Sequence, residues 1–134
     1  MEKFLSLKIG MTIEQSEELL NEKFTIEHRR EEHFKSDIVH FENVGVLLFF
    51  NPETEILETI RYEAPFALAV EDVKIGDTKK DVKSKKGIAP RIDPFPYPDT
   101  QPTTIWIYGS HHNADFVRFD FEKTRNGKCV RIIK

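Results

Sequence analysis

The sequence predicts an α+β protein made of two tandem repeats, each a helix followed by antiparallel strands. The segment Leu7-Lys8-Ile9-Gly10-Met11-Thr12 recurs as Val73-Lys74-Ile75-Gly76-Asp77-Thr78, an offset of 66 residues. A hairpin-like pattern follows in each half, and this order of elements favours α+β over a parallel doubly wound sheet. The chain has 134 residues, about the size of one domain. We therefore expect a single domain, 1–134, with internal repeats at about 1–66 and 67–134.

Each Gly-x-Thr step predicts where a helix begins. Glycine permits a backbone conformation that a Cβ disfavours, and the threonine then caps the helix. Thr12 is followed three residues later by Gln15, which forms a capping box. Thr78 is followed at the same distance by Asp81, which places an acid near the positive end of the helix. The first helix carries a narrow core-facing stripe formed by Ile13, Ser16, Leu19 and Leu20.

Lysines dominate the second predicted helix, whose apolar residue is Val82. The run comprises Lys79, Lys80, Lys83, Lys85 and Lys86. This helix should therefore be short and largely exposed. The run has no interleaved aromatic residues and the net charge of the chain is −3, so we do not expect nucleic acid as a partner.

The strands are predicted from runs of β-branched and aromatic residues bounded by turn residues. In the first half they lie at about 24–30, 37–42, 44–50 and 56–62. In the second half they lie at 104–108, 116–121 and 129–133. Each repeat is thus a helix followed by three or four antiparallel strands.

Residues 87–103 interrupt this pattern because they hold five of the seven prolines, namely Pro90, Pro94, Pro96, Pro98 and Pro102. Proline has no backbone N–H, which excludes a central strand or a helix interior. We expect an extended, polyproline-like loop that wraps the surface.

The [Leu/Val]-Lys-Ile-Gly-x-Thr step, the short helix and the hairpin resemble the tandem units of β-lactamase-inhibitor-like proteins. They are also similar to the single unit of the small lipoproteins of the outer-membrane barrel-assembly machine. In those families the helix ends in Leu-Gly-x-Pro; here Gly87 is followed by Pro90, and Asn21 stands at the turn of the first copy. The resemblance implies one open antiparallel sheet with helices on one face. In the inhibitor-like family the other face, often concave, grips a partner protein.

Alternation along two predicted strands divides their side chains between these faces. Toward the helices we expect Ile105, Ile107, Val117, Phe119 and Phe121. On the other face we expect Trp106, Tyr108, Arg118 and Asp120. Exposed Trp, Tyr and Arg dominate binding hot spots, so these four residues are candidates for contact with a partner. The alternative for Trp106 is packing beneath the proline-rich loop.

Charge is divided unevenly along the chain. Residues 1–72 hold 16 acidic and 7 basic residues, a net charge of −9, whereas residues 73–134 hold 7 acidic and 13 basic residues, a net charge of +6. An acidic half steers a basic partner and speeds encounter. We therefore expect a non-enzymatic protein-binding or inhibitory domain. One specific form of this expectation is a bacterial immunity protein that neutralises a basic toxin. The solvated acidic pair Glu31-Glu32 is a further candidate for contact with this partner.

The alternative is a small enzyme or ligand-binding domain. Its pocket would lie between the sheet face and the proline-rich loop, and its candidate lining residues are His40, Tyr62, Arg118 and Asp120. The sequence holds no phosphate-binding Gly-rich loop, nucleophile elbow or paired-cysteine motif. We accordingly expect no catalytic residues and no cofactor.

Metal binding and secretion are also not expected. His111, His112 and Asp115 form the one cluster that suggests a metal, but a zinc site usually needs three or four ligands, and adjacent histidines on a strand face opposite ways. The lone Cys129 cannot form an internal disulfide and should be a buried apolar residue. Charges interrupt the first fifteen residues, and the longest apolar stretch, 44–50, is far too short to span a bilayer. We expect a cytoplasmic protein without membrane contact.

Overall fold

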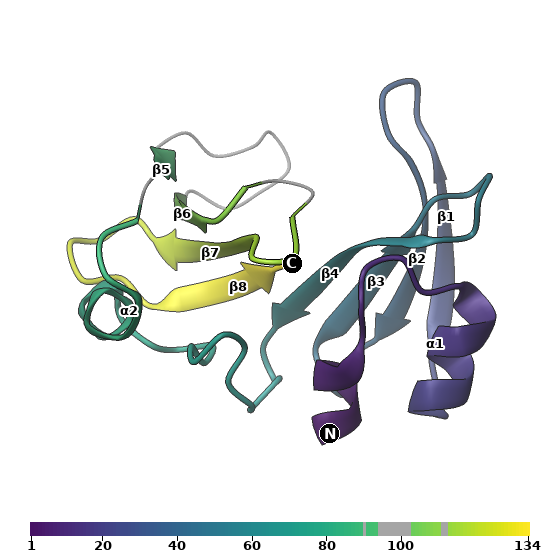
Figure 1. Ribbon diagram of the computed structural model, residues 1–134, viewed down its shortest axis with the longest axis horizontal. Coiled ribbons are helices and arrows are strands. Elements are labelled where there is room, and N and C mark those ends of the chain that lie inside the picture. The colour runs from purple at the N-terminus through teal and green to yellow at the C-terminus, as the bar shows by residue number, and fades with distance from the viewer. Residues whose placement is uncertain (90, 94–102, 111–112) are drawn as a thin grey trace. The chain divides into compact units, whose positions relative to one another are not determined.

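The computed structural model describes residues 1–89, 91–93, 103–110 and 113–134 (Figure 1). The chain divides into two compact units, unit 1 at Met1–Phe66 and unit 2 at Ala67–Lys134. The expectation of a single domain with two internal repeats stays a prediction. Each unit has its own helix and its own strands, and the paired strands within each unit are antiparallel. The α+β class is confirmed.

Unit 1 is a helix followed by a four-stranded antiparallel meander. Its elements are the 3-10 helix η1 (Glu2–Ser6), α1 (Ile13–Leu20), β1 (Thr25–Arg30), β2 (Lys35–Phe41), β3 (Val46–Phe50) and β4 (Leu57–Glu63). Each strand pairs with the next along the chain. The sequence predicted α1 and all four strands to within about two residues, whereas η1 was not predicted.

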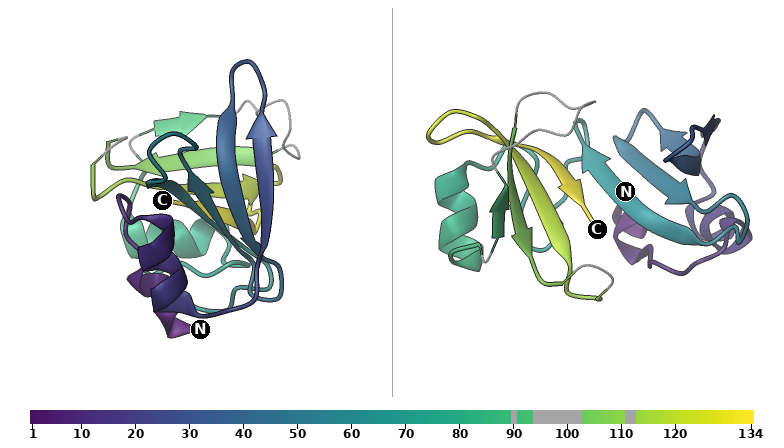
Figure 2. Two further views of the ribbon diagram at one scale, coloured as in Figure 1. Left: turned by 90° about the vertical axis from the view of Figure 1, so that its right-hand side faces the viewer. Right: turned by 90° about the horizontal axis from the view of Figure 1, so that it is seen from above.

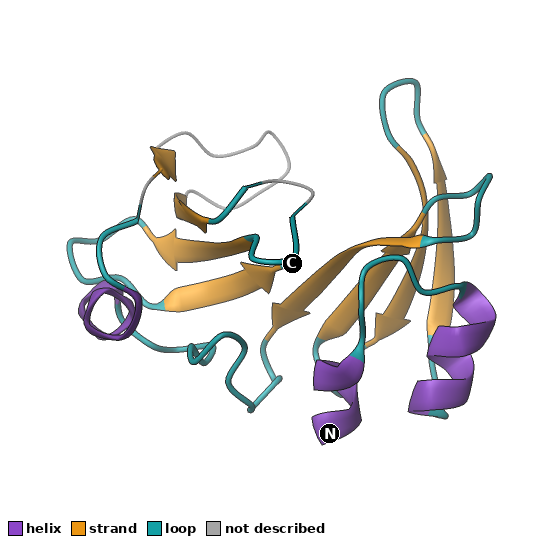
Figure 3. Cartoon of the chain, in the orientation of Figure 1, coloured by secondary structure: helices purple, strands orange, loops and turns teal. Residues whose placement is uncertain are grey.

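Unit 2 repeats the order of helix and four strands. Its elements are α2 (Lys79–Lys86), β5 (Arg91–Asp93), β6 (Thr103–Tyr108), β7 (Val117–Glu122) and β8 (Cys129–Ile133) (Figure 3). The strand β5 corrects the expectation that 87–103 is a loop throughout, because Arg91–Asp93 pairs with β6. This triplet contains no proline, so it can donate backbone hydrogen bonds as a short strand. The other part of the expected loop, Pro90 and 94–102, lies outside the described residues.

Both helices begin with complete capping boxes; the sequence predicted the first box, whereas for the second it predicted a weaker version. Thr12 Oγ1 accepts from Gln15 N at 3.2 Å, and Gln15 Oε1 accepts from Thr12 N at 3.0 Å. In unit 2, Asp81 and Thr78 exchange bonds of the same kind at 3.2 and 3.0 Å. Because an aspartate reaches the cap as well as a glutamine does, the second box is complete.

Two backbone hydrogen bonds tie the start of each helix to the last strand of its unit. In unit 1, Gly10 N donates to Leu57 O at 2.9 Å, and Leu57 N donates to Met11 O at 2.8 Å. The matching bonds of unit 2 run from Gly76 N to Cys129 O at 2.8 Å and from Cys129 N to Asp77 O at 2.7 Å. We call each pair of bonds a brace. Each brace holds the N-terminus of a helix beside the turn that precedes the last strand.

The core of unit 1 lies between its helices and one face of its strands. The rings of Phe4 in η1 and Phe41 in β2 meet edge to face at 5.2 Å. The hydroxyl of Tyr62 in β4 donates to Phe4 O at 3.2 Å. Figure 2 shows the purple helices of unit 1 along one side of its strands. The buried side chains of this face also include Val46, Leu48, Phe50 and Ile60.

We predict that Gly45→Ala destabilises the protein much more than Gly10→Ala. Both glycines have positive φ, 80° and 98° respectively, so alanine is strained at either position by about 1–2 kcal/mol. A Cβ at Gly10 meets nothing within 4 Å, whereas one at Gly45 collides with Glu63 O and lies 2.8 Å from Pro65 N. The collision adds a further cost of about 1–3 kcal/mol. Urea unfolding of the two variants measures the difference, and equal shifts of the midpoint would contradict this geometry.

Candidate functional site

Two of the candidate binding residues, Trp106 and Tyr108, face the helix of unit 2 rather than away from it. The hydroxyl of Tyr108 donates to Gly87 O, at the end of α2, at 2.8 Å, and Lys86 Nζ lies 5.7 Å from the centre of the Tyr108 ring. The Trp106 ring packs 4.7 Å from that of Phe121. Burial raises the pKa of Tyr108, which keeps its hydroxyl protonated as a donor.

The expected faces of β6 are therefore reversed. Its residues 104–108 read Thr-Ile-Trp-Ile-Tyr, so both faces of the strand carry large apolar side chains. Alternation alone therefore does not show which of the two faces packs against the helix. The register decides, because Trp106 pairs with Phe119 and Tyr108 pairs with Val117. Directly opposed residues share a face. The inward positions of Val117, Phe119 and Phe121 in β7 are confirmed; all three are buried.

On the opposite face of the unit 2 strands, Asp120 is fully buried between two arginines. Arg118 donates to it through Nε at 2.7 Å and through Nη2 at 2.8 Å, and Arg131 Nε donates at 3.0 Å. Nη2 of Arg131 is buried and has no hydrogen-bond partner among the residues that the structure describes. Asp120 thus faces away from α2 as predicted, but it has no exposure to solvent. It is an acceptor fixed by two cations, an arrangement that builds a rigid ion cluster.

The remaining candidates lie in unit 1, and the structure does not bring them together. His40 and Tyr62 point to opposite faces, since His40 pairs with Leu47 while Tyr62 pairs with Val46. Tyr62 is buried at 2% exposure and its hydroxyl is bonded within the core. Glu31 and Glu32 are exposed in the turn between β1 and β2. As binding residues all of these stay predictions, as do Arg118 and Asp120 in unit 2.

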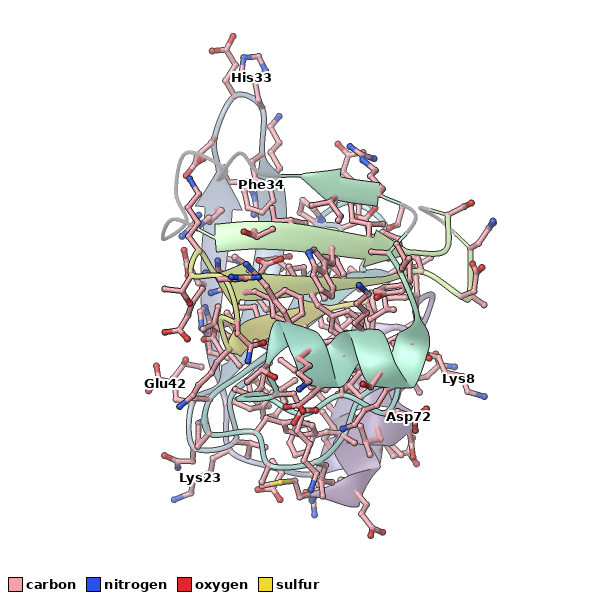
Figure 4. All side chains as sticks on the ribbon, turned by 90° about the vertical axis from the view of Figure 1, so that its left-hand side faces the viewer. Lys8, Lys23, His33, Phe34, Glu42 and Asp72 are labelled. Carbon is pink, nitrogen blue, oxygen red and sulfur yellow. The ribbon has the colours of Figure 1, made fainter. Side chains whose placement is uncertain are left out.

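A groove of 490 Å³ lies at the open end of the β1–β2 hairpin. It is lined by Glu22, Lys23, Phe24, Thr25, His40, Glu42 and Asn43. Figure 4 shows Lys23 and Glu42 near this end, far from His33 at the tip of the hairpin. His40 Nε2 lies 3.0 Å from Glu27 Oε1. A hydrogen bond from Arg29, with a second contribution from His40, lowers the pKa of Glu27, so this carboxylate is ionised beside the groove.

The most distinctive charged surface of unit 1 is where α1 meets the turn between β3 and β4. The brace and the bridge between Thr12 and Ile56 hold these two segments together. Five exposed glutamates gather on them, Glu14, Glu17, Glu18, Glu53 and Glu55. The segments 13–20 and 51–56 contain no Lys or Arg. None of the five forms an ion pair with another described residue. We call this set the acidic corner.

The same place in unit 2 has the opposite charge. Its brace and the bridge between Thr78 and Lys128 hold α2 beside the β7–β8 turn, and Lys80 N donates to Asn126 Oδ1 at 3.1 Å. Five exposed cations gather here, Lys80, Lys83, Lys123, Arg125 and Lys128, and we call them the basic corner. None forms an ion pair with another described residue. Charge counting along the sequence found the asymmetry, but only the braces show where it is concentrated.

Three further expectations concern Cys129, metal binding and membrane-spanning helices. Cys129 is buried, as predicted, at 1% exposure. Among the described residues no group of three or more His, Cys, Asp or Glu could hold a metal ion, and His111 and His112 lie outside them. None of the described helices is long and apolar enough to cross a membrane.

Comparison with known proteins gives a neighbour in structure but none in sequence. No family model matches the chain, and no curated protein matches it. A solved structure of a DUF4309 family protein, YjgB from Bacillus subtilis subsp. subtilis str. 168, is similar with a TM-score of 0.51 and 15% sequence identity. The match covers 90% of this chain and 76% of that one, so it extends over both units. At this identity the likeness concerns the fold alone, and the family resemblance in the sequence stays a prediction.

We predict that Asp120→Asn destabilises the protein by about 3–5 kcal/mol, because it removes the buried carboxylate to which two largely buried guanidinium groups donate. Glu63→Gln is the matched control, since Arg61 precedes Glu63 as Arg118 precedes Asp120, and Arg61 Nη2 lies 3.0 Å from Glu63 Oε2. That pair is about one-third exposed, so its loss should cost less than about 1 kcal/mol. Chemical denaturation measures both costs. Similar losses for the two variants would show that Asp120 is not a buried ion partner.

We predict that the Cys129 thiol does not react in the folded protein near neutral pH. Burial, followed by the charge of Asp120, raises its pKa from 9.0 to about 12. Such a shift leaves about a thousandfold less thiolate, the reactive form. A chromogenic disulfide reagent should therefore label Cys129 only after denaturant is added. Equal labelling rates with and without denaturant would be the contrary result.

Proposed function

We propose that this chain is a non-enzymatic protein-binding domain whose acidic corner receives a basic surface of another protein. The observation that carries the proposal is the group of five exposed glutamates, which come from two segments and form no ion pair within the described part of the chain. Carboxylates at such a surface keep their hydration until a partner arrives, and they attract a positive surface over about 10 Å at moderate salt. The specific form of the proposal is a bacterial immunity protein that neutralises a basic toxin domain.

The tandem repeat is part of this proposal. Each unit has the same capping box, the same brace and the same order of helix and four strands. Both third strands are irregular near their ends, at Phe49/Phe50 in β3 and at Asp120/Phe121 in β7. These matches support two copies of one building unit that have diverged in surface charge. One copy then supplies the acidic corner without any change to its core.

Charge reversal distinguishes the acidic corner, which the structure suggests as the binding surface, from the β1–β2 turn, which the sequence suggested. Glu14→Lys with Glu17→Lys reverses two charges of the acidic corner, and Glu31→Lys with Glu32→Lys makes the same change in the β1–β2 turn. All four side chains are exposed, so both variants should fold. Trp106→Ala is a poorer test, because the Trp106 ring packs on Phe121 and its loss disturbs the core of unit 2.

We expect affinity capture from a lysate of the source organism to retain a basic protein on the wild-type chain. The corner variant should lose it, and the turn variant should keep it at a level within about threefold, since isolated surface charges contribute little. Mass spectrometry identifies the protein, and titration calorimetry with the purified partner measures the loss. Capture that is unchanged in the corner variant would overturn the acidic corner as the site, and capture of no protein would overturn the function.

A second candidate function, ligand binding, is favoured by the groove beside His40. Its 490 Å³ lies within the range of small-molecule sites, and it combines one aromatic wall, Phe24, with several polar groups. The expected pocket against the proline-rich loop lies outside the described residues. A fragment screen that follows the His40 imidazole resonance by NMR tests this candidate. Fragments that shift this resonance would support it, and the absence of any such fragment would remove it.

A further inference from the structure

The basic corner of unit 2 is a surface that the proposed function does not use. Its five cations come from α2 and from a turn about 40 residues later in the chain, and all five side chains are exposed. The neighbouring lysines of the same helix have local partners. Lys85 pairs with Asp77 at 2.9 Å, and Lys79 donates to Thr124 O at 2.8 Å. The five cations of the basic corner form no ion pair with the residues that the structure describes, which sets this patch apart from the lysines that stabilise the fold.

The chain itself contains a surface that complements this patch. The acidic corner is built on the same framework, a helix start held beside a hairpin turn by a brace, and it presents five carboxylates where the basic corner presents five cations. With the first capping threonine aligned on the second, Glu14 corresponds to Lys80 and Glu17 corresponds to Lys83. Charge is reversed at these two helix positions, whereas Glu18 corresponds to the uncharged Ser84.

We propose that the basic corner docks the acidic corner of a second copy of this chain. Five exposed carboxylates on one copy attract five exposed cations on the other, and every ion pair formed relieves like-charge repulsion within both corners. The contact joins different surfaces of the two copies, so one copy keeps its acidic corner free and the other copy keeps its basic corner free for a further contact. The interface is small and solvated, which makes the association weak and dependent on salt.

The first experiment measures the weight-average mass by sedimentation equilibrium over a range of protein concentrations. At about 0.01 M salt, where charges act over about 30 Å, the mass should rise above that of the monomer as concentration increases. At about 1 M salt, where the range is about 3 Å, the protein should be monomeric. A monomer at every concentration and both salt levels overturns the inference. A mass that rises equally at high salt also overturns it, because the contact is then not electrostatic.

Charge-swap variants identify the surfaces. Lys80→Glu with Lys83→Glu should weaken self-association at least about tenfold, and so should Glu14→Lys with Glu17→Lys. A mixture of the two variants should associate again, because the intact acidic corner of one variant then meets the intact basic corner of the other. The four substitutions combined in one chain should also restore self-association. The matched control, Glu31→Lys with Glu32→Lys, should stay within about threefold of the wild type. Circular dichroism verifies that each variant is folded. A mixture that remains monomeric contradicts the proposal.

These variants also separate this inference from the proposed function. Lys80→Glu with Lys83→Glu should weaken self-association at least about tenfold and still capture a basic protein through the intact acidic corner. If the wild type is a monomer but binds a fluorescent single-stranded DNA oligonucleotide through the same lysines, the basic corner has another occupant and the inference is wrong. Capture of a basic protein would stand in that case, since it does not depend on unit 2.

Discussion

The structure depends on one local arrangement, the brace that joins each Gly-x-Thr step to the last strand of its unit. In unit 1 it consists of the bonds between Gly10, Met11 and Leu57, and in unit 2 of those between Gly76, Asp77 and Cys129. The glycine has positive φ in both units, so the chain turns into the helix at a point where it can also pair with the strand. A helix start is thereby fixed beside a hairpin turn. The charges of both segments then lie on one surface.

This arrangement explains how two units with similar frameworks can present opposite surfaces. The groups that form the brace are backbone atoms, and the cap needs only a threonine and a short acidic or amide side chain three residues later. The charged side chains of the two corners take no part in the brace or the cap. These side chains are glutamates in unit 1, whereas they are lysines and one arginine in unit 2. Surface substitutions of this kind cost little stability, so charge can diverge while the fold persists.

Much of the fold was predictable because its signals are local. Capping boxes, the glycine before each cap and alternating hairpin strands all act within about ten residues. The candidate site was less predictable because it depends on register and on contacts distant in the sequence. Trp106 and Tyr108 were assigned to the wrong face because β6 is apolar on both sides, and only its pairing with β7 resolves the choice. Asp120 has the alternation of an exposed residue, yet Arg131, eleven residues later, takes part in burying its charge.

The brace is tested most directly by hydrogen exchange of the amides of Leu57 and Cys129, measured by NMR under native conditions. Each amide donates to a carbonyl of its Gly-x-Thr step, at 2.8 Å for Leu57 and 2.7 Å for Cys129. We expect both to exchange as slowly as the central amides of their own sheets, because exchange then requires opening of the whole unit. Arg125, in the exposed β7–β8 turn, should exchange fast. If Leu57 or Cys129 exchanged as fast as the Arg125 amide, the helix of that unit would not be fixed to its last strand, and the corner of that unit would not exist as a defined surface.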